Sequence, residues 1–147
     1  MIRICILGSL NESLEDIEMV ANAFVKNNIF EEYVDVDCRI PSKVSKNSGI
    51  GLRSIISNWY KIIDGADIVI AVKKRDGSIG DGTEYMLSYA KHVGKNIIAT
   101  IDPLEVKSID GMVLAIIGAA LNSYLEEGRT KEKDELWGDK LYDHYAD

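Results

Sequence analysis

Two acidic side chains in a glycine-rich loop have the types and spacing best suited to chemistry in this chain. The loop at residues 80–84, GDGTE, follows an apolar strand pattern and leads into a helical pattern. Carboxylates at the end of such a loop can serve as a nucleophile, a general base or a ligand of hydroxyl groups. Asp81 and Glu84 are therefore the candidate catalytic residues. The same two residues also have the N-cap and N3 spacing of a capping box, which would explain both of them without any chemistry.

A second candidate site is the turn at residues 8–11, GSLN, which follows the first strand pattern. Gly8 would let a ligand approach the backbone, and the helix N-terminus behind it offers N–H groups to an anion. Ser9 and Asn11 add side-chain donors, although both residue types are also favoured as plain N-caps. No dinucleotide fingerprint follows Gly8 and no cluster has metal-ligand spacing, so we expect neither a cofactor nor a metal.

Strand and helix patterns alternate along the chain and must position these loops. Strands are expected at 2–7, 33–40, 67–72 and 96–101, with helices at about 14–24, 52–66, 83–93 and 112–125. This alternation predicts a single α/β domain, a three-layer sandwich around a parallel sheet of four or five strands. Ligands of such sheets bind outside the carboxyl ends of the strands. The loops at 8–11, 41–49, 73–82 and 102–108 are therefore the ones to inspect.

Length and composition limit the classes of function. The chain has 147 residues, enough for one domain at 1–129, followed by a polar tail at 130–147 whose apolar stripe should dock on the domain or on a partner subunit. No signal peptide and no apolar run of membrane-spanning length are found, which predicts a cytoplasmic protein without a membrane partner. The net charge of −7 disfavours a nucleic acid polymer as partner. A small anionic ligand would be held by a few local donors.

Two further features bear on environment and assembly. Cys5 and Cys38 each lie in an apolar strand pattern, which favours reduced core thiols over a disulfide or a zinc site. The expected helix at 112–125 is apolar on nearly all sides, so it should be buried in the core or in a subunit interface. Together with the aromatic tail, this helix suits a homodimer.

Residues from about 52 to 100 resemble the nucleoside 2-deoxyribosyltransferase family and the related nucleotide N-glycoside hydrolases. The similarity lies in a helix containing Asn58 and Trp59, in GADIVIAV at 65–72, in the Gly82-Thr83 loop and in GKNIIAT at 94–100. The opening ICILGSLN at 4–11 is similar to that family's first strand and Gly-Ser turn.

The resemblance implies a flavodoxin-like or Rossmann-like fold that cleaves the base–sugar bond of a nucleoside or its 5′-monophosphate through a carboxylate nucleophile. The sugar would then be transferred to another base or to water. The implied ligand-binding residues line the loops and the facing helices: Gly8, Ser9, Asn11, Trp59, Gly80, Gly82, Thr83 and Met86.

The family pattern Asp-x-Gly-Thr-x-x-Glu does not fit this chain at its two acids. When it is aligned on Gly82, its Asp falls on Gly80 and its nucleophilic Glu falls on Met86. A thioether cannot serve as the base or the carboxylate nucleophile. Either the loop presents Asp81 or Glu84 to the ligand instead, or the glycosidic chemistry has been lost.

Three hypotheses therefore stand. The chain is an N-glycosidase or transferase, or a catalytically inactive module that senses or sequesters a nucleotide in the same pocket, or an unrelated α/β protein such as a flavin or phospho-signalling domain. The signalling variant needs an aspartate at the end of the third strand, and residues 68–74 contain none.

Overall fold

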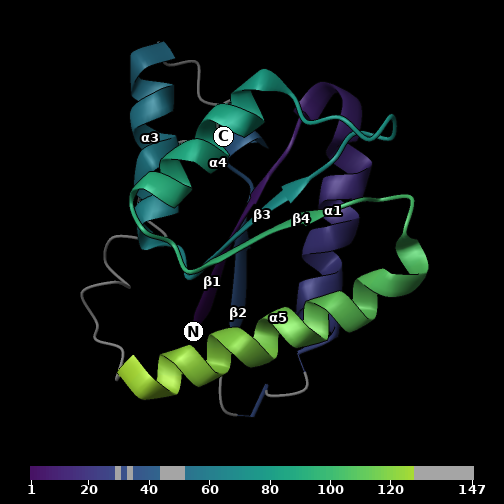
Figure 1. Cartoon of the computed structure of the whole chain (residues 1–147), viewed down its shortest axis with the longest axis vertical. Coiled ribbons are helices and arrows are strands. Elements are labelled where there is room, and N and C mark those ends of the chain that lie inside the picture. The colour runs from purple at the N-terminus through teal and green to yellow at the C-terminus, as the bar shows by residue number, and fades with distance from the viewer. Residues whose placement is uncertain (29–30, 33–34, 44–51, 128–147) are drawn as a thin grey trace.

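The computed structural model describes residues 1–28, 31–32, 35–43 and 52–127 of the chain (Figure 1). In chain order, the elements are β1 (Ile2–Leu7), α1 (Leu10–Lys26), β2 (Val36–Arg39), α3 (Leu52–Gly65), β3 (Ile68–Val72), α4 (Asp81–His92), β4 (Ile97–Ile101) and α5 (Val106–Glu127). Strands and helices alternate, as their sequence patterns predict.

The strands of the described residues form one parallel sheet in the order β2-β1-β3-β4. Ile4 pairs with Cys38 on one side of β1, and Leu7 pairs with Ala71 of β3 on the other. The chain therefore winds outward from β1 in one direction to β2 and in the other direction to β3 and β4. This is the doubly wound, flavodoxin-like arrangement, and it confirms the predicted fold class.

Helices cover both faces of the sheet, because alternate side chains of each strand point to opposite faces. Ile4 and Ile6 of β1 pack with α1 and α5, whereas Cys5 and Leu7 pack with α3 and α4. The first layer is centred on residues that are all buried: Ile17, Val20, Phe24, Ile68, Ile70, Val113 and Ile117. The second layer is centred on Ile62, Ile63, Val69, Ala71, Met86, Leu87 and Ala90.

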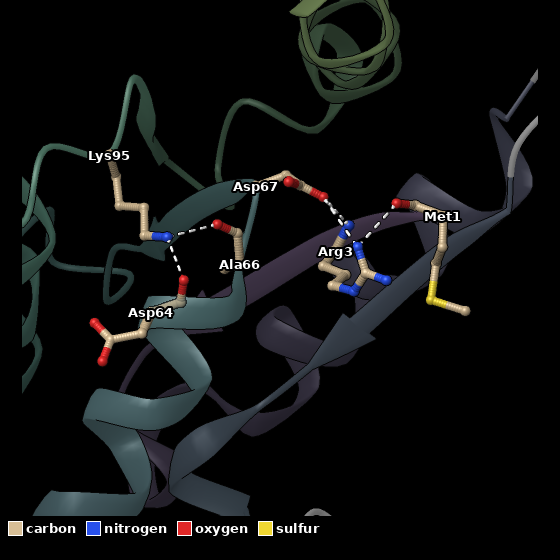
Figure 2. A network of polar contacts seen from close by, with 6 residues as sticks. All are labelled: Met1, Arg3, Asp64, Ala66, Asp67 and Lys95. Atoms are coloured by element: carbon tan, nitrogen blue, oxygen red, sulfur yellow. Dashed lines mark hydrogen bonds and ion pairs between the residues drawn. The ribbon is translucent and has the colours of Figure 1, made fainter. Parts of the chain in front are cut away.

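Polar contacts tie the amino ends of the strands together (Figure 2). The backbone N–H of Arg3 donates to Asp67 Oδ2 at 2.9 Å, and the two side chains, both buried, form an ion pair at 3.9 Å. Lys95 Nζ donates to the carbonyl oxygens of Asp64 at 2.6 Å and Ala66 at 2.9 Å. The Lys95 ammonium thus satisfies carbonyls at the end of α3, where a positive charge is favourable.

Helix α4 ends as its sequence predicts but begins earlier. Gly94 has a φ of +82°, and the N–H groups of Gly94 and Lys95 donate to the carbonyls of Lys91 and Ala90. These bonds form a Schellman cap, which confirms Gly94 as the residue that ends the helix. The start of α4 is at Asp81, two residues before the predicted Thr83.

Other boundaries differ from the sequence predictions. Strand β2 covers only Val36–Arg39, and residues 41–43 are helical where a loop was expected, because proline is well suited to the first turn of a helix. Helix α5 is longer than predicted, and within this chain it is buried on one face only. Asp110 and Ala115 on the other face are exposed.

The cysteines are free thiols on opposite faces of the sheet. Cys5 packs toward α3 and α4, whereas the Cys38 thiol points to α1 and approaches the Ala21 carbonyl oxygen at 3.8 Å. The prediction that they form no disulfide is confirmed. No helix of the described ranges is long and apolar enough to span a bilayer. The tail at 130–147 and most of the 41–49 loop lie outside the described residues.

Candidate functional site

The candidate site lies at the carboxyl ends of β1 and β3, which are neighbours in the sheet. Helix α1 follows β1 and packs on one face, and α4 follows β3 and packs on the other. The two connections therefore diverge at this point, which makes it the switch point of the doubly wound sheet. In open α/β sheets this is the position where a crevice for small ligands forms.

Both helices that begin at this switch point lack a side-chain cap. Ser9 is the N-cap of α1 and Gly80 is the N-cap of α4, and neither N-cap forms a side-chain hydrogen bond to its helix. The first N–H groups of an α-helix have no acceptor within the helix, and they carry part of the positive end of its dipole. Two sets of backbone donors therefore flank the switch point.

Gly8 has a packing role that the sequence does not reveal. It is buried, and a Cβ atom placed on it would lie 2.6 Å from Cδ1 of Ile17 and 3.6 Å from the carbonyl oxygen of Val72. The absence of a side chain lets α1 pack directly on the sheet. Ser9 is half-buried beside it, and the side chain of Asn11 lies outside the described residues.

A lysine from the β3–α4 loop joins this loop to the first turn of α1. Lys74 Nζ lies 2.8 Å from Oε2 of Glu12, which is in the first turn of α1. The hydrogen bond and the charge of Glu12 raise the pKa of Lys74, so the ammonium form is stabilised. A Cβ atom on Gly80 would lie 3.9 Å from Lys74 Nζ, which places this cation beside the start of α4 as well.

The next residue, Arg75, forms a second bridge. Its Nη2 and Nε donate to the two carboxylate oxygens of Asp16 at 3.1 and 3.3 Å, and the Asp16 side chain is buried. A tight turn fixes the backbone here, because the N–H of Lys74 donates to Ser78 O and the N–H of Gly77, at a φ of +85°, donates to Lys74 O. Lys74 and Arg75 are thus held by a rigid loop.

The first turn of α4 places the candidate carboxylates in solvent. Asp81 and Glu84 are exposed, and within the described residues neither forms a hydrogen bond or an ion pair. The capping-box expectation is wrong, because Gly80 is the N-cap and the two acids fall at N1 and N4. Gly82, at N2, is exposed, and an added Cβ would contact no atom within 4 Å.

Two buried polar side chains lie on the α3–α4 face of the sheet. Thr83 in the first turn of α4 is 7% exposed, and Asn58 of α3 is 4% exposed. Neither side chain forms a hydrogen bond in the part of the chain that the structure describes. Because α3 ends where β3 begins, the turn with Asn58 lies nearer the carboxyl ends of the strands than the turn with Ile62. Both residues therefore lie toward the edge of the sheet that holds the candidate site.

Met86 and Trp59 belong to the packing of the same face. Met86 is 3% exposed and lies in the apolar cluster with Ile62 and Leu87, and Trp59 is half-buried against that cluster. The position that aligns with the family's nucleophile therefore faces the core, and Glu84, two residues earlier, faces solvent.

A hollow of about 570 Å³ lies between α1 and α5, and none of the candidate site residues lines it. Its floor is apolar, with Met19, Ala23 and Ile109, and its rim carries charges of both signs. No group of three or more potential metal ligands occurs among the described residues. The chemistry available at the switch point is therefore that of a lysine, backbone donors, two buried polar residues and two exposed carboxylates.

Reasoning from sequence did not select three residues of this site as ligand-binding residues. Lys74 and Arg75 stand in the run KKR directly after the third strand pattern, which is a visible cluster of positive charge in an acidic chain. Asn58 is a polar residue within an otherwise apolar helical stripe. Both signals were available. No such signal pointed to their partners, Glu12 and Asp16, because the role of these two residues depends on how α1 is oriented.

The fold defines the class of protein: a doubly wound α/β domain whose switch point lies between its first and third strands. Comparison with protein-family models, curated proteins and solved structures finds no match for this chain. The resemblance to nucleoside 2-deoxyribosyltransferases therefore rests on the sequence motifs themselves.

Proposed function

We propose that this chain binds a nucleoside or nucleotide in the crevice between the ends of β1 and β3. The observation that carries the proposal is the meeting of two helix N-termini, neither with a side-chain cap, at the switch point of the sheet. Buried Asn58 and Thr83 would supply hydrogen bonds to the base or sugar. The motif resemblance at residues 52–100 supports the same class of ligand.

The test is a binding panel of common ribo- and deoxyribonucleosides and their 5′-monophosphates. A ligand at 100 times its Kd should stabilise the fold by about 2.7 kcal/mol, a shift of several degrees in Tm. Calorimetry then gives the affinity. If no member of the panel raises Tm or releases heat, the proposal is wrong.

Two variants connect binding to the crevice. Thr83→Val keeps the shape of the side chain and removes its hydroxyl, and Asn58→Leu removes the amide at similar size. Each should weaken binding by about threefold to tenfold, the value of one hydrogen bond. Asn96→Leu is the matched control, since Asn96 is exposed at the opposite edge of the sheet, before β4. Equal affinities for N58L and N96L would contradict a role for Asn58.

Cleavage of the N-glycosidic bond is a second candidate function. It is favoured by one observation: Asp81 and Glu84 are exposed at N1 and N4 of α4, where the capping explanation required them at the N-cap and N3. In this reaction a carboxylate oxygen bonds to C1′ while the C1′–N bond breaks and the base leaves with a proton. Water then hydrolyses the glycosyl ester, which frees the sugar and restores the carboxylate.

Release of free base, followed by chromatography, tests this second function. If Glu84 is the nucleophile, Glu84→Gln should abolish release of the base, and if Asp81 is the nucleophile, Asp81→Asn should do so. Either variant should retain its affinity for the ligand. Glu105→Gln, an exposed acid after β4, is the control. Binding without release of any base in the wild type would identify a binding module and reject the hydrolase.

We also propose that the chain forms a homodimer. The support is apolar surface left open on α4, where Tyr85 and Val93 are exposed. Light scattering during size-exclusion chromatography should give twice the chain mass of 16.3 kDa. Elution as a monomer at tens of micromolar would contradict the proposal.

A further inference from the structure

Glu12 places a carboxylate of the protein itself beside the switch point of the sheet. Its Oε2 lies 2.8 Å from Nζ of Lys74, and it belongs to the first turn of α1. The Lys74 ammonium in turn lies beside Gly80, the uncapped start of α4. The cation that links the two helix N-termini therefore already holds an anion.

The two partners of this ion pair differ in how firmly they are held. The Lys74 side chain is 27% exposed, and its backbone is fixed by the turn that closes on Ser78. The Glu12 side chain is 57% exposed, and Lys74 is its partner among the described residues. A flexible, solvent-exposed carboxylate loses little on leaving such a pair, since exposed ion pairs contribute at most about 1 kcal/mol.

We infer that Lys74 is the residue that binds a phosphate monoester on the ligand, and that Glu12 occupies its place until the phosphate arrives. The inference rests on the proposed nucleotide site. A phosphate monoester carries about −1.5 to −2 charges at neutral pH against −1 for a carboxylate, so it competes well for a lysine flanked by helix N-termini. The start of α4 adds backbone N–H donors beside Lys74, since a Cβ atom on its N-cap Gly80 would lie 3.9 Å from Lys74 Nζ.

Glu12 also gives the site selectivity. A neutral nucleoside does not need Lys74, and it leaves the Lys74–Glu12 pair intact. A weak anion must displace Glu12 in a chain of net charge −7, where the overall field disfavours it. A dianionic phosphate attached to a bound nucleoside overcomes both costs, so Lys74 and Glu12 together favour nucleoside monophosphates.

The experiment measures, at fixed ionic strength, the Kd of a nucleoside from the panel and of its 5′-monophosphate. Wild type should bind the monophosphate about tenfold more tightly, the value of one charge-assisted contact. Lys74→Gln should weaken the monophosphate by about tenfold and the nucleoside by less than twofold. Glu12→Gln should tighten the monophosphate by about threefold and leave the nucleoside unchanged.

Glu18→Gln is the matched control for Glu12→Gln. It removes the same charge from the same helix, but its partner is Lys43 at 3.3 Å. If E12Q and E18Q change monophosphate affinity equally, the effect is only net charge and the inference is overturned. It is also overturned if K74Q weakens nucleoside and monophosphate alike. If nucleosides bind as tightly as their monophosphates, the inference is wrong but the proposed function stands. If neither binds at all, the proposed function itself is wrong.

Discussion

A Cβ atom on Gly8 would lie only 2.6 Å from Cδ1 of Ile17, so the turn after β1 has no room for a side chain. Ile17 is fully buried between α1 and the sheet and has little freedom to move. Gly8→Ala should therefore lower the free energy of unfolding by about 1–3 kcal/mol, the usual cost of overpacking a core. Urea denaturation measures the change.

Two further variants isolate the contact between Gly8 and Ile17. Ile17→Val removes Cδ1, so the double variant G8A/I17V should lose less stability than the two single variants added together. Gly118→Ala in α5 is the control, because an added Cβ there meets no atom within 4 Å. It should gain about 0.5–1 kcal/mol from higher helix propensity. Strict additivity in the double variant would show that Ile17 is not the obstacle.

Met86 fills the place where the resembling family carries its nucleophile, and the structure buries it in the apolar cluster under α4. Met86→Glu should therefore destabilise the fold and restore no chemistry. Burial raises the pKa of a carboxyl group, so the part of the loss that is due to ionisation should be small near pH 4.5 and grow by up to about 1.4 kcal/mol per pH unit above it. Denaturation at pH 5.0 and 7.5 measures this growth.

Met86→Gln separates charge from polarity in that experiment, because it is similar in size and cannot ionise. The gap in stability between M86E and M86Q should widen from pH 5.0 to 7.5. A constant gap would mean that the new carboxylate reaches water, and M86E would then deserve a test for release of base.

Lys95 stabilises the junction between α3 and β3 through its two bonds to backbone carbonyls (Figure 2). Lys95→Met keeps the apolar stem and removes both donors. The loss should be about 1–3 kcal/mol, as for hydrogen bonds to a charged group. Lys91→Met, at an exposed position of α4, should change stability by less than about 0.5 kcal/mol. Equal Tm values for the two variants would contradict the role of Lys95.

The order and type of the elements could be predicted from the sequence because apolar periodicity reports directly which faces are buried. IVIAV at 68–72 is apolar throughout, and the structure buries it on both faces as a central strand. The first residue of a helix could not be predicted where several residues in a row suit a helix start. Asp81 and Thr83 both suit the beginning of a helix, and the backbone instead uses Gly80 as the N-cap.

The candidate site was predictable in position but not in detail. The rule for parallel sheets locates the crevice at the ends of β1 and β3 once the strand order is known. Whether Glu84 or Met86 faces inward depends on where α4 begins, and a shift of two residues turns a side chain by about 200°. Pairs such as Lys74 with Glu12 join residues 62 positions apart, so only the packed structure reveals them.

Cys38 makes the stability of the fold sensitive to alkaline pH. Burial, with a smaller effect of Asp37, raises the pKa of its thiol from 9.0 to about 12. The unfolded chain therefore loses this proton at lower pH than the folded one. Stability from the thiol is complete below pH 9 and falls between pH 9 and 12, by up to about 1.4 kcal/mol per pH unit. The stability difference between wild type and Cys38→Ala should be constant from pH 7 to 9 and shrink toward pH 11, whereas a constant difference would mean that the folded protein accommodates the thiolate.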